Sequence, residues 1–139
     1  MYIHPARKMP FNVLYAGMCA EVLKGNVDVV YGHDDFEGLL LYTYTRQCQM
    51  DKAWNEFNLL ARGLVLYPPA ELVLATPFPK FFNYGEMALR LPDEPFEATD
   101  KIDGSLGIIF CWNEEIRCIT RGSFVSEQGK WATRQLKEK

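Results

Sequence analysis

The residues best able to do chemistry lie in one short run, residues 100–105, with the sequence Asp-Lys-Ile-Asp-Gly-Ser. Its Asp-Gly-Ser part is typical of a tight turn that needs the backbone freedom of glycine. Short strands are predicted at 96–99 and 106–112, so Lys101 is expected in a connection between two strands. An amine held in this way can be directed into a pocket, where partial burial and nearby cations would make it a nucleophile. From these residues alone, a surface hairpin with an idle lysine is the alternative.

Three other cations stand where a phosphate could be bound. Arg62 begins an otherwise apolar strand, where a guanidinium is costly to place unless an anion or a neighbouring acid neutralises it. Lys80 follows an extended segment fixed by two prolines and precedes two phenylalanines. Arg121 ends a predicted hairpin and is followed by glycine. These positions are candidates for a local cluster of cations.

Composition limits the classes of function. The chain of 139 residues has a net charge of -3 and a pI near 5.4, which argues against a broad basic face for nucleic acid. Its four cysteines lack the Cys-x-x-Cys spacing of a metal site, so reduced, packed thiols and no metal ligands are expected. No signal peptide or membrane span is apparent, so we expect a cytoplasmic protein with no membrane partner.

Hydrophobic periodicity predicts one domain of the α+β class, with antiparallel sheets and flanking helices. Helices are expected at 11–23, at 51–60 with Asp51 as the cap, and after Ser126. The expected strands are 27–31, 38–45, 61–67, 72–75, 96–99, 106–112 and 116–120. Tyr42 and Tyr44 alternate onto one face of their strand, where they either line a ligand site or pack in the core.

The lysine run resembles a known motif. Residues 101–105 resemble the adenylate-accepting lysine motif of the covalent nucleotidyltransferases, which include the ATP-dependent nucleic-acid ligases and the capping enzymes. Residues 61–66, 77–86 and 120–128 are similar to segments of the bacteriophage RNA ligase 1 branch of that superfamily. The four stretches occur in the family's order and cover about residues 37–132.

The resemblance implies an ATP-dependent RNA ligase that uses ATP and Mg²⁺. It divides the chain into residues 1–36, an N-terminal helix and strand, and residues 37–139, the N-terminal part of a nucleotidyltransferase domain. Lys101 would accept AMP, and the nucleotide would then pass to an RNA 5′-phosphate that is joined to a 3′-hydroxyl. The residues implied in nucleotide binding are Tyr42, Arg62, Lys80, Thr99, Asp103, Gly104 and Arg121. Arg121 stands where the branch has lysine, which keeps the charge and changes the donor geometry.

The family's later motifs have no counterpart after Ser123. We therefore expect a fragment, a truncated product or half of a split ligase, with weak or no activity by itself. A second chain that supplies those motifs is an expected partner beside RNA. The alternative is a non-catalytic module that binds a nucleotide or RNA.

Overall fold

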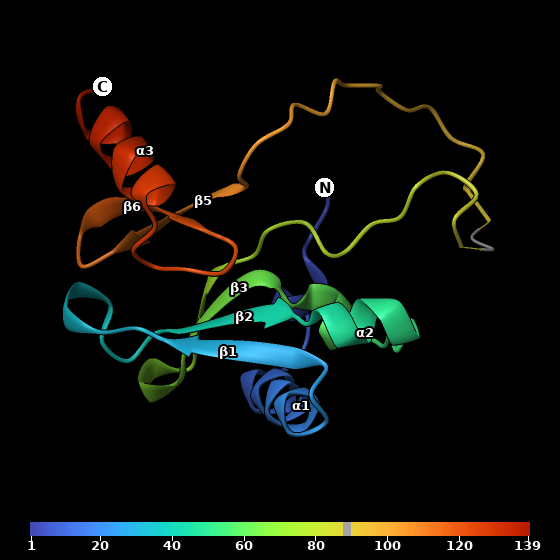
Figure 1. The fold of residues 1–139 in the computed structure, drawn as a ribbon, viewed down its shortest axis with the longest axis horizontal. Coiled ribbons are helices and arrows are strands. Elements are labelled where there is room, and N and C mark those ends of the chain that lie inside the picture. Colours follow the sequence, from blue (N-terminus) through green and yellow to red (C-terminus); the bar gives the residue numbers. More distant parts are fainter. Residues whose placement is uncertain (88–89) are drawn as a thin grey trace.

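The computed structural model describes residues 1–87 and 90–139 and has a mixed α+β fold built on antiparallel sheets (Figure 1). A four-stranded sheet has the order β1-β2-β3-β4, and a separate two-stranded sheet pairs β5 with β6. The strands of the larger sheet are β1 (Val27–Tyr31), β2 (Leu40–Tyr44), β3 (Arg62–Tyr67) and β4 (Leu72–Ala75). Those of the smaller sheet are β5 (Gly107–Trp112) and β6 (Glu115–Thr120). These six strands confirm predictions to within two residues at each end.

Three α-helices flank the sheets: α1 (Phe11–Leu23), α2 (Arg46–Asp51) and α3 (Glu127–Lys137). The bounds of α1 agree with the prediction, and Gly25, at a φ of 80°, follows its C-cap. The predicted cap of α3 is also confirmed, because the Gly129 N–H donates to the Ser126 hydroxyl at 3.2 Å. Among the described residues, no helix combines the length and apolar character needed to cross a membrane.

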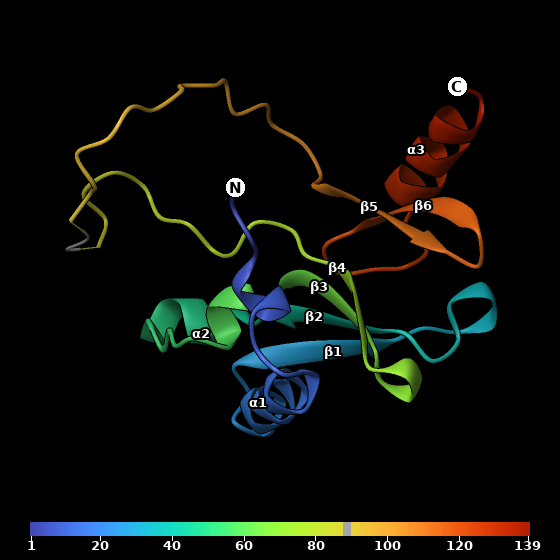
Figure 2. The ribbon, with the colours of Figure 1, turned by 180° about the vertical axis from the view of Figure 1, so that it is seen from behind.

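The elements form layers with two apolar cores (Figures 1 and 2). On one face of the larger sheet, α1 packs its Leu14 and Met18 against Tyr42 and Leu64. On the other face, Leu41 and Val65 pack with residues of the smaller sheet and its flanking loop, namely Ile108, Phe110, Ile119 and Phe124. Burial alternates along β5, with Ile108 and Phe110 buried and Ile109 and Cys111 exposed. Residues on the second face of the sheet are therefore fixed against β5 and β6.

The predicted helix at 51–60 is wrong. The helix instead occupies 46–51, because the Thr45 hydroxyl accepts the Cys48 N–H at 3.1 Å and so supplies the cap assigned to Asp51. Lys52 ends it with a left-handed backbone at a φ of 51°. The following loop is then held by the buried carboxylate of Glu21, which accepts hydrogen bonds from the amides of two loop asparagines. This long-range polar contact prevails over local periodicity.

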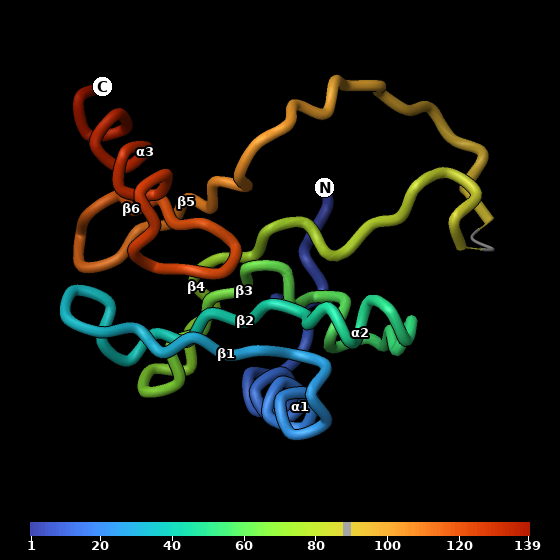
Figure 3. Tube along the Cα trace, viewed as in Figure 1, coloured from blue at the N-terminus to red at the C-terminus, as the bar shows by residue number. Residues whose placement is uncertain are grey.

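The predicted strand at 96–99 is also wrong. All described residues from 90 to 105 are exposed, and no hydrogen bond between described residues involves them. A strand requires backbone partners, and this segment has none in the part of the chain described. Figure 3 shows the chain between β4 and β5 running out from the body and returning to it. Lys101 is therefore held by a strand on one side only, through β5.

Candidate functional site

A β-bulge at Gly63 decides where Arg62 lies. β3 pairs Leu64 with Tyr42 but Arg62 with Thr43, so Gly63 is an extra residue in the ladder. Without the bulge Arg62 would share the face of Leu64, which packs on α1. With the bulge, Arg62 lies on the side facing the smaller sheet. There it lines a pocket together with residues just before β5 and residues at the end of β6. The bulge at Gly63 thus places the Arg62 side chain on the face of the larger sheet that packs against β5 and β6.

Only glycine fits at the bulge. Gly63 has a φ of 94°, in the left-handed region that side chains rarely adopt. A Cβ built on it would lie 2.2 Å from the Cδ1 atom of Ile108 on β5. This methyl is the end of a side chain that can turn away, so the left-handed backbone is the firmer reason for glycine at this position.

The pocket beside Arg62 brings together three of the sequence segments singled out above. It has a volume of about 360 Å³ and is lined by Arg62, by Gly104, Ser105 and Leu106 of the lysine run, and by Thr120, Arg121 and Gly122. Gly104 has a φ of 140°, so the turn uses the backbone freedom expected of glycine. Two arginines and a glycine turn from separate parts of the sequence thus line one cavity.

Aromatic rings connect Arg121 to Lys80. The Arg121 guanidinium donates to the Tyr44 hydroxyl at 3.1 Å and lies 5.0 Å from the centre of its ring. Trp54 packs edge-on against Tyr44 and against Phe82, with centroids 5.1 and 5.7 Å apart. The Lys80 ammonium lies 5.0 Å from the centre of the Phe82 ring. Cation–π contacts therefore hold these two charges, and neither forms a salt bridge with a carboxylate in residues 1–87 and 90–139.

The cations at this site lack acidic partners in the part of the chain described. None of the salt bridges there involves Arg62, Lys80, Lys101 or Arg121. Arg62 is held instead by the Phe78 carbonyl at 3.3 Å and by the Phe81 ring, 5.0 Å from its guanidinium carbon. Of these cations, Arg62 and Arg121 line the cavity, and Lys80 and Lys101 do not. The two guanidinium groups therefore keep hydrogens with which they can bind an anion.

Lys101, Thr99 and Asp103 are exposed on the segment that precedes β5. None of the three lines the pocket, whereas Gly104, three residues after the lysine, does. Three residues span at most about 10 Å, so the Lys101 amine is within reach of the cavity by a movement of the segment. The lysine is near the cations in sequence and tethered to them, without being locked in place.

Of the two tyrosines on β2, Tyr44 and not Tyr42 lies beside Arg121. Tyr42 is only 2% exposed and packs in the core against α1, and burial raises the pKa of its hydroxyl. The strand pattern predicts the shared face of Tyr42 and Tyr44, whereas Trp54 falls in the helix wrongly predicted at 51–60. Its place between Tyr44 and Phe82 depends on the Glu21 contact with its loop, which no local pattern predicts.

No group of three or more histidine, cysteine, aspartate or glutamate residues is arranged for a metal ion within residues 1–87 and 90–139. All four cysteines are free thiols, two buried and two exposed. Comparison with known proteins gives no relative: no protein-family model matches the chain, and no curated protein matches it.

Proposed function

We propose that this chain is part of the nucleotidyltransferase domain of an ATP-dependent RNA ligase, with Lys101 as the residue that accepts AMP. The observation that carries the proposal is the cavity shared by Arg62, Arg121 and the Gly104-Ser105 turn. These are residues from three separate motifs of the resemblance, and they meet although 59 positions separate the two arginines in sequence.

The chemistry begins with the neutral amine of Lys101. Its Nζ atom attacks the α-phosphorus of ATP, a nitrogen–phosphorus bond forms, and the bond from that phosphorus to the pyrophosphate oxygen breaks. The displaced pyrophosphate carries the leaving electron pair, and the nitrogen loses its remaining extra proton to solvent. AMP then passes from the lysine to an RNA 5′-phosphate, and attack by a 3′-hydroxyl releases AMP and joins the ends.

The other residues serve binding and charge stabilisation. Arg62 and Arg121 offer planar donor forks to the phosphates, and Lys80, which does not line the cavity, offers a point charge in the adjoining aromatic cluster. Their lack of acidic partners fits a polyphosphate, whose developing charge they neutralise in the transition state. Asp103 orients the ribose or the lysine segment. Mg²⁺ bound together with ATP would supply further neutralisation of the phosphate charge, since this ion is commonly held by phosphate oxygens and water.

The direct test is incubation with ATP and Mg²⁺ followed by mass spectrometry of the intact chain and its peptides. We expect an AMP adduct on Lys101, absent in Lys101→Ala and retained in Lys130→Ala, which removes an exposed lysine of α3. An adduct that persists in Lys101→Ala, or no adduct in the wild-type chain even when later family motifs are supplied on a second chain, contradicts the proposal.

A second candidate is a module that binds ATP or RNA without reacting. The observation that favours it is the exposure of Lys101 and of every described neighbour from 90 to 105, since a nucleophile is usually held more firmly. Calorimetric titration with ATP separates the two. Binding that depends on Arg62 and Arg121, with no adduct under any condition, supports the module.

A further inference from the structure

We propose that the groove between β4 and β5 is the path of a single-stranded nucleic-acid segment whose end reaches Arg62. The inference deepens the proposed function and rests on it for the identity of the reacting end. The groove adjoins the pocket at Gly104 and Arg121, and both Arg62 and Leu106 line the two cavities. It has a volume of about 630 Å³.

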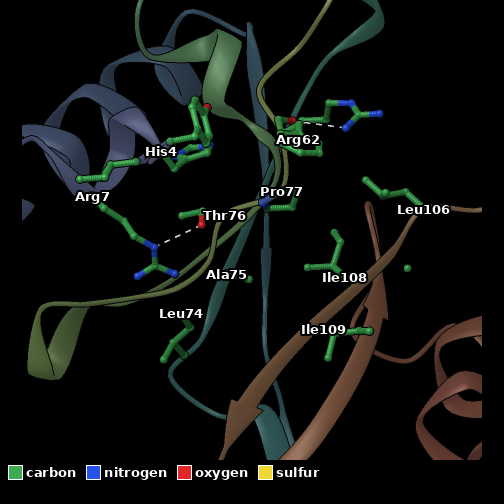
Figure 4. Close-up of a pocket in the computed structure, with 14 residues that line it drawn as sticks. His4, Arg7, Arg62, Leu74, Ala75, Thr76, Pro77, Leu106, Ile108 and Ile109 are labelled. Carbon is green, nitrogen blue, oxygen red and sulfur yellow. Dashed lines mark hydrogen bonds between the residues drawn. The ribbon is translucent and has the colours of Figure 1, made fainter. Parts of the chain in front are cut away.

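Two cations, Arg62 and Arg7, are among the residues that line the groove (Figure 4). Pro77 and Thr76 lie between them on one wall. Ile108 and Ile109 of β5 form the opposite wall. Charges separated by an apolar floor suit a chain with repeating anions and flat apolar groups between them, which describes a nucleic-acid strand.

Aromatic side chains supply a surface for bases. Tyr2 and Phe78 both line the groove, with ring centroids 6.3 Å apart, and they are 63% and 69% exposed. Exposed rings beside cations are the usual platform for single strands, because every base has a face that can stack. Their exposure leaves both rings open to a base.

Arg7 is oriented without being neutralised. Its Nη1 atom donates to the Val73 carbonyl at 2.8 Å and its Nε atom to the Thr76 hydroxyl at 3.2 Å. No salt bridge among the described residues involves Arg7. Its remaining guanidinium hydrogens are available to a phosphate, and the two contacts hold the group in place.

An extended peptide is the competing occupant, because β4 is the edge strand of its sheet. Arg7 already engages the backbone carbonyl of Val73 in that strand, which removes part of the ladder a peptide would need. The paired aromatic rings at the groove have no role in such a ladder. These two features favour a nucleic-acid strand.

The test is fluorescence anisotropy with a short 5′-phosphorylated oligoadenylate, measured on the full chain without ATP over a series of salt concentrations. We expect Arg7→Gln to weaken binding roughly tenfold and to reduce the slope of log K against log salt by about 0.7, the value for one lost phosphate contact on a single strand. Tyr2→Ala should weaken binding roughly tenfold and leave the slope unchanged.

Two control variants separate charge from structure. Arg134→Gln removes an exposed arginine of α3 and should leave both affinity and slope as in the wild-type chain. Thr76→Val removes only the Nε contact of Arg7 and should keep the slope. Equal loss of affinity in Thr76→Val and Arg7→Gln with no change of slope would mean that Arg7 acts structurally, and the inference would be overturned.

Other outcomes also decide the matter. Tighter, Arg7-dependent binding of an acidic peptide than of the oligonucleotide would overturn the inference in favour of a peptide site. Failure of AMP labelling contradicts the proposed function alone, because strand binding is measured without ATP. Conversely, the chain could be labelled with AMP while its affinity for the strand is unchanged by substitution of Arg7 or Tyr2. That result would support the proposed function and overturn the inference about the groove.

Discussion

Arg62 and Lys101 belong to one proposed site, yet the structure holds them in opposite ways. Arg62 stands on β3 within two packed layers and is directed by a bulge that only glycine permits. Lys101 stands on a segment in which each described residue from 90 to 105 is exposed and none makes a hydrogen bond to another described residue. The side that we propose binds phosphate is formed in advance, and the side that carries the proposed nucleophile is not.

This difference indicates an order of events. A nucleotide bound by Arg62 and Arg121 would present its phosphates at the Gly104 turn, and the lysine segment would then settle on them. The cost of ordering that segment is taken from binding energy, which lowers the apparent affinity for ATP. Specificity can arise at this step, because only a ligand that reaches the turn can order the lysine.

The largest effect is expected on folding stability, from a substitution at the Gly63 bulge that positions Arg62. Gly63→Ala places a Cβ at an unfavourable φ and against Ile108, and should lower the free energy of unfolding by about 3 kcal/mol in urea titrations. Gly25→Ala, at a φ of 80° with open space around it, should cost only about 1 kcal/mol. The double variant Gly63→Ala with Ile108→Val should recover part of the loss. Equal costs at the two glycines would mean that contact with β5 is unimportant.

Removal of the Arg62 charge should lower the affinity for ATP and leave the free energy of unfolding almost unchanged. Arg62→Ala should weaken ATP binding by about 2 kcal/mol, roughly 30-fold, because a charge-assisted contact to phosphate is lost. Calorimetric titration measures this, with Arg134→Ala as the charge-matched control. Should Arg62→Ala bind ATP as well as the control does, the anion lies elsewhere and the comparison fails.

The exposed segment that carries Lys101 should become more resistant to proteolysis when a nucleotide binds. A glutamate-specific protease is expected to cut first after Glu97, because the bond after Glu94 leads into proline and resists cleavage. A non-hydrolysable ATP analogue should slow this cut several-fold by ordering the segment. The same analogue should protect Arg62→Ala much less. Resistance to cleavage without any nucleotide would show that Lys101 is held in place already.

The smallest expected effect is a pH dependence of folding stability caused by His4, which lines the groove between β4 and β5. Burial, aided by Arg7 and opposed by the Pro77 carbonyl, lowers the pKa of His4 below its usual 6.5. The unfolded chain then binds more protons than the folded one, so stability is full above about pH 6.5 and declines as the pH falls toward the folded pKa. His4→Asn, which keeps an acceptor for the Ala6 N–H, should flatten the decline, whereas exposed His33→Asn should not.

Most regular elements could be predicted because their signals are local. Apolar alternation identifies β5, and the cap at Ser126 together with an amphipathic run identifies α3. The two wrong predictions, the helix at 51–60 and the strand at 96–99, both concern contacts between residues that are distant in the sequence. At 51–60 a long-range contact with Glu21 prevails over helical spacing, and at 96–99 a strand-like sequence has no partner among the described residues.

The candidate site divides in the same manner. The sequence by itself determined which residues carry charge and which glycines permit turns, because residue type and φ freedom are properties of single positions. Only the tertiary structure decided that Arg62 faces β5, that Arg121 meets Tyr44 and that Tyr42 is buried against α1. These outcomes depend on a bulge and on packing between sheets, and such contacts join residues that are distant in the chain.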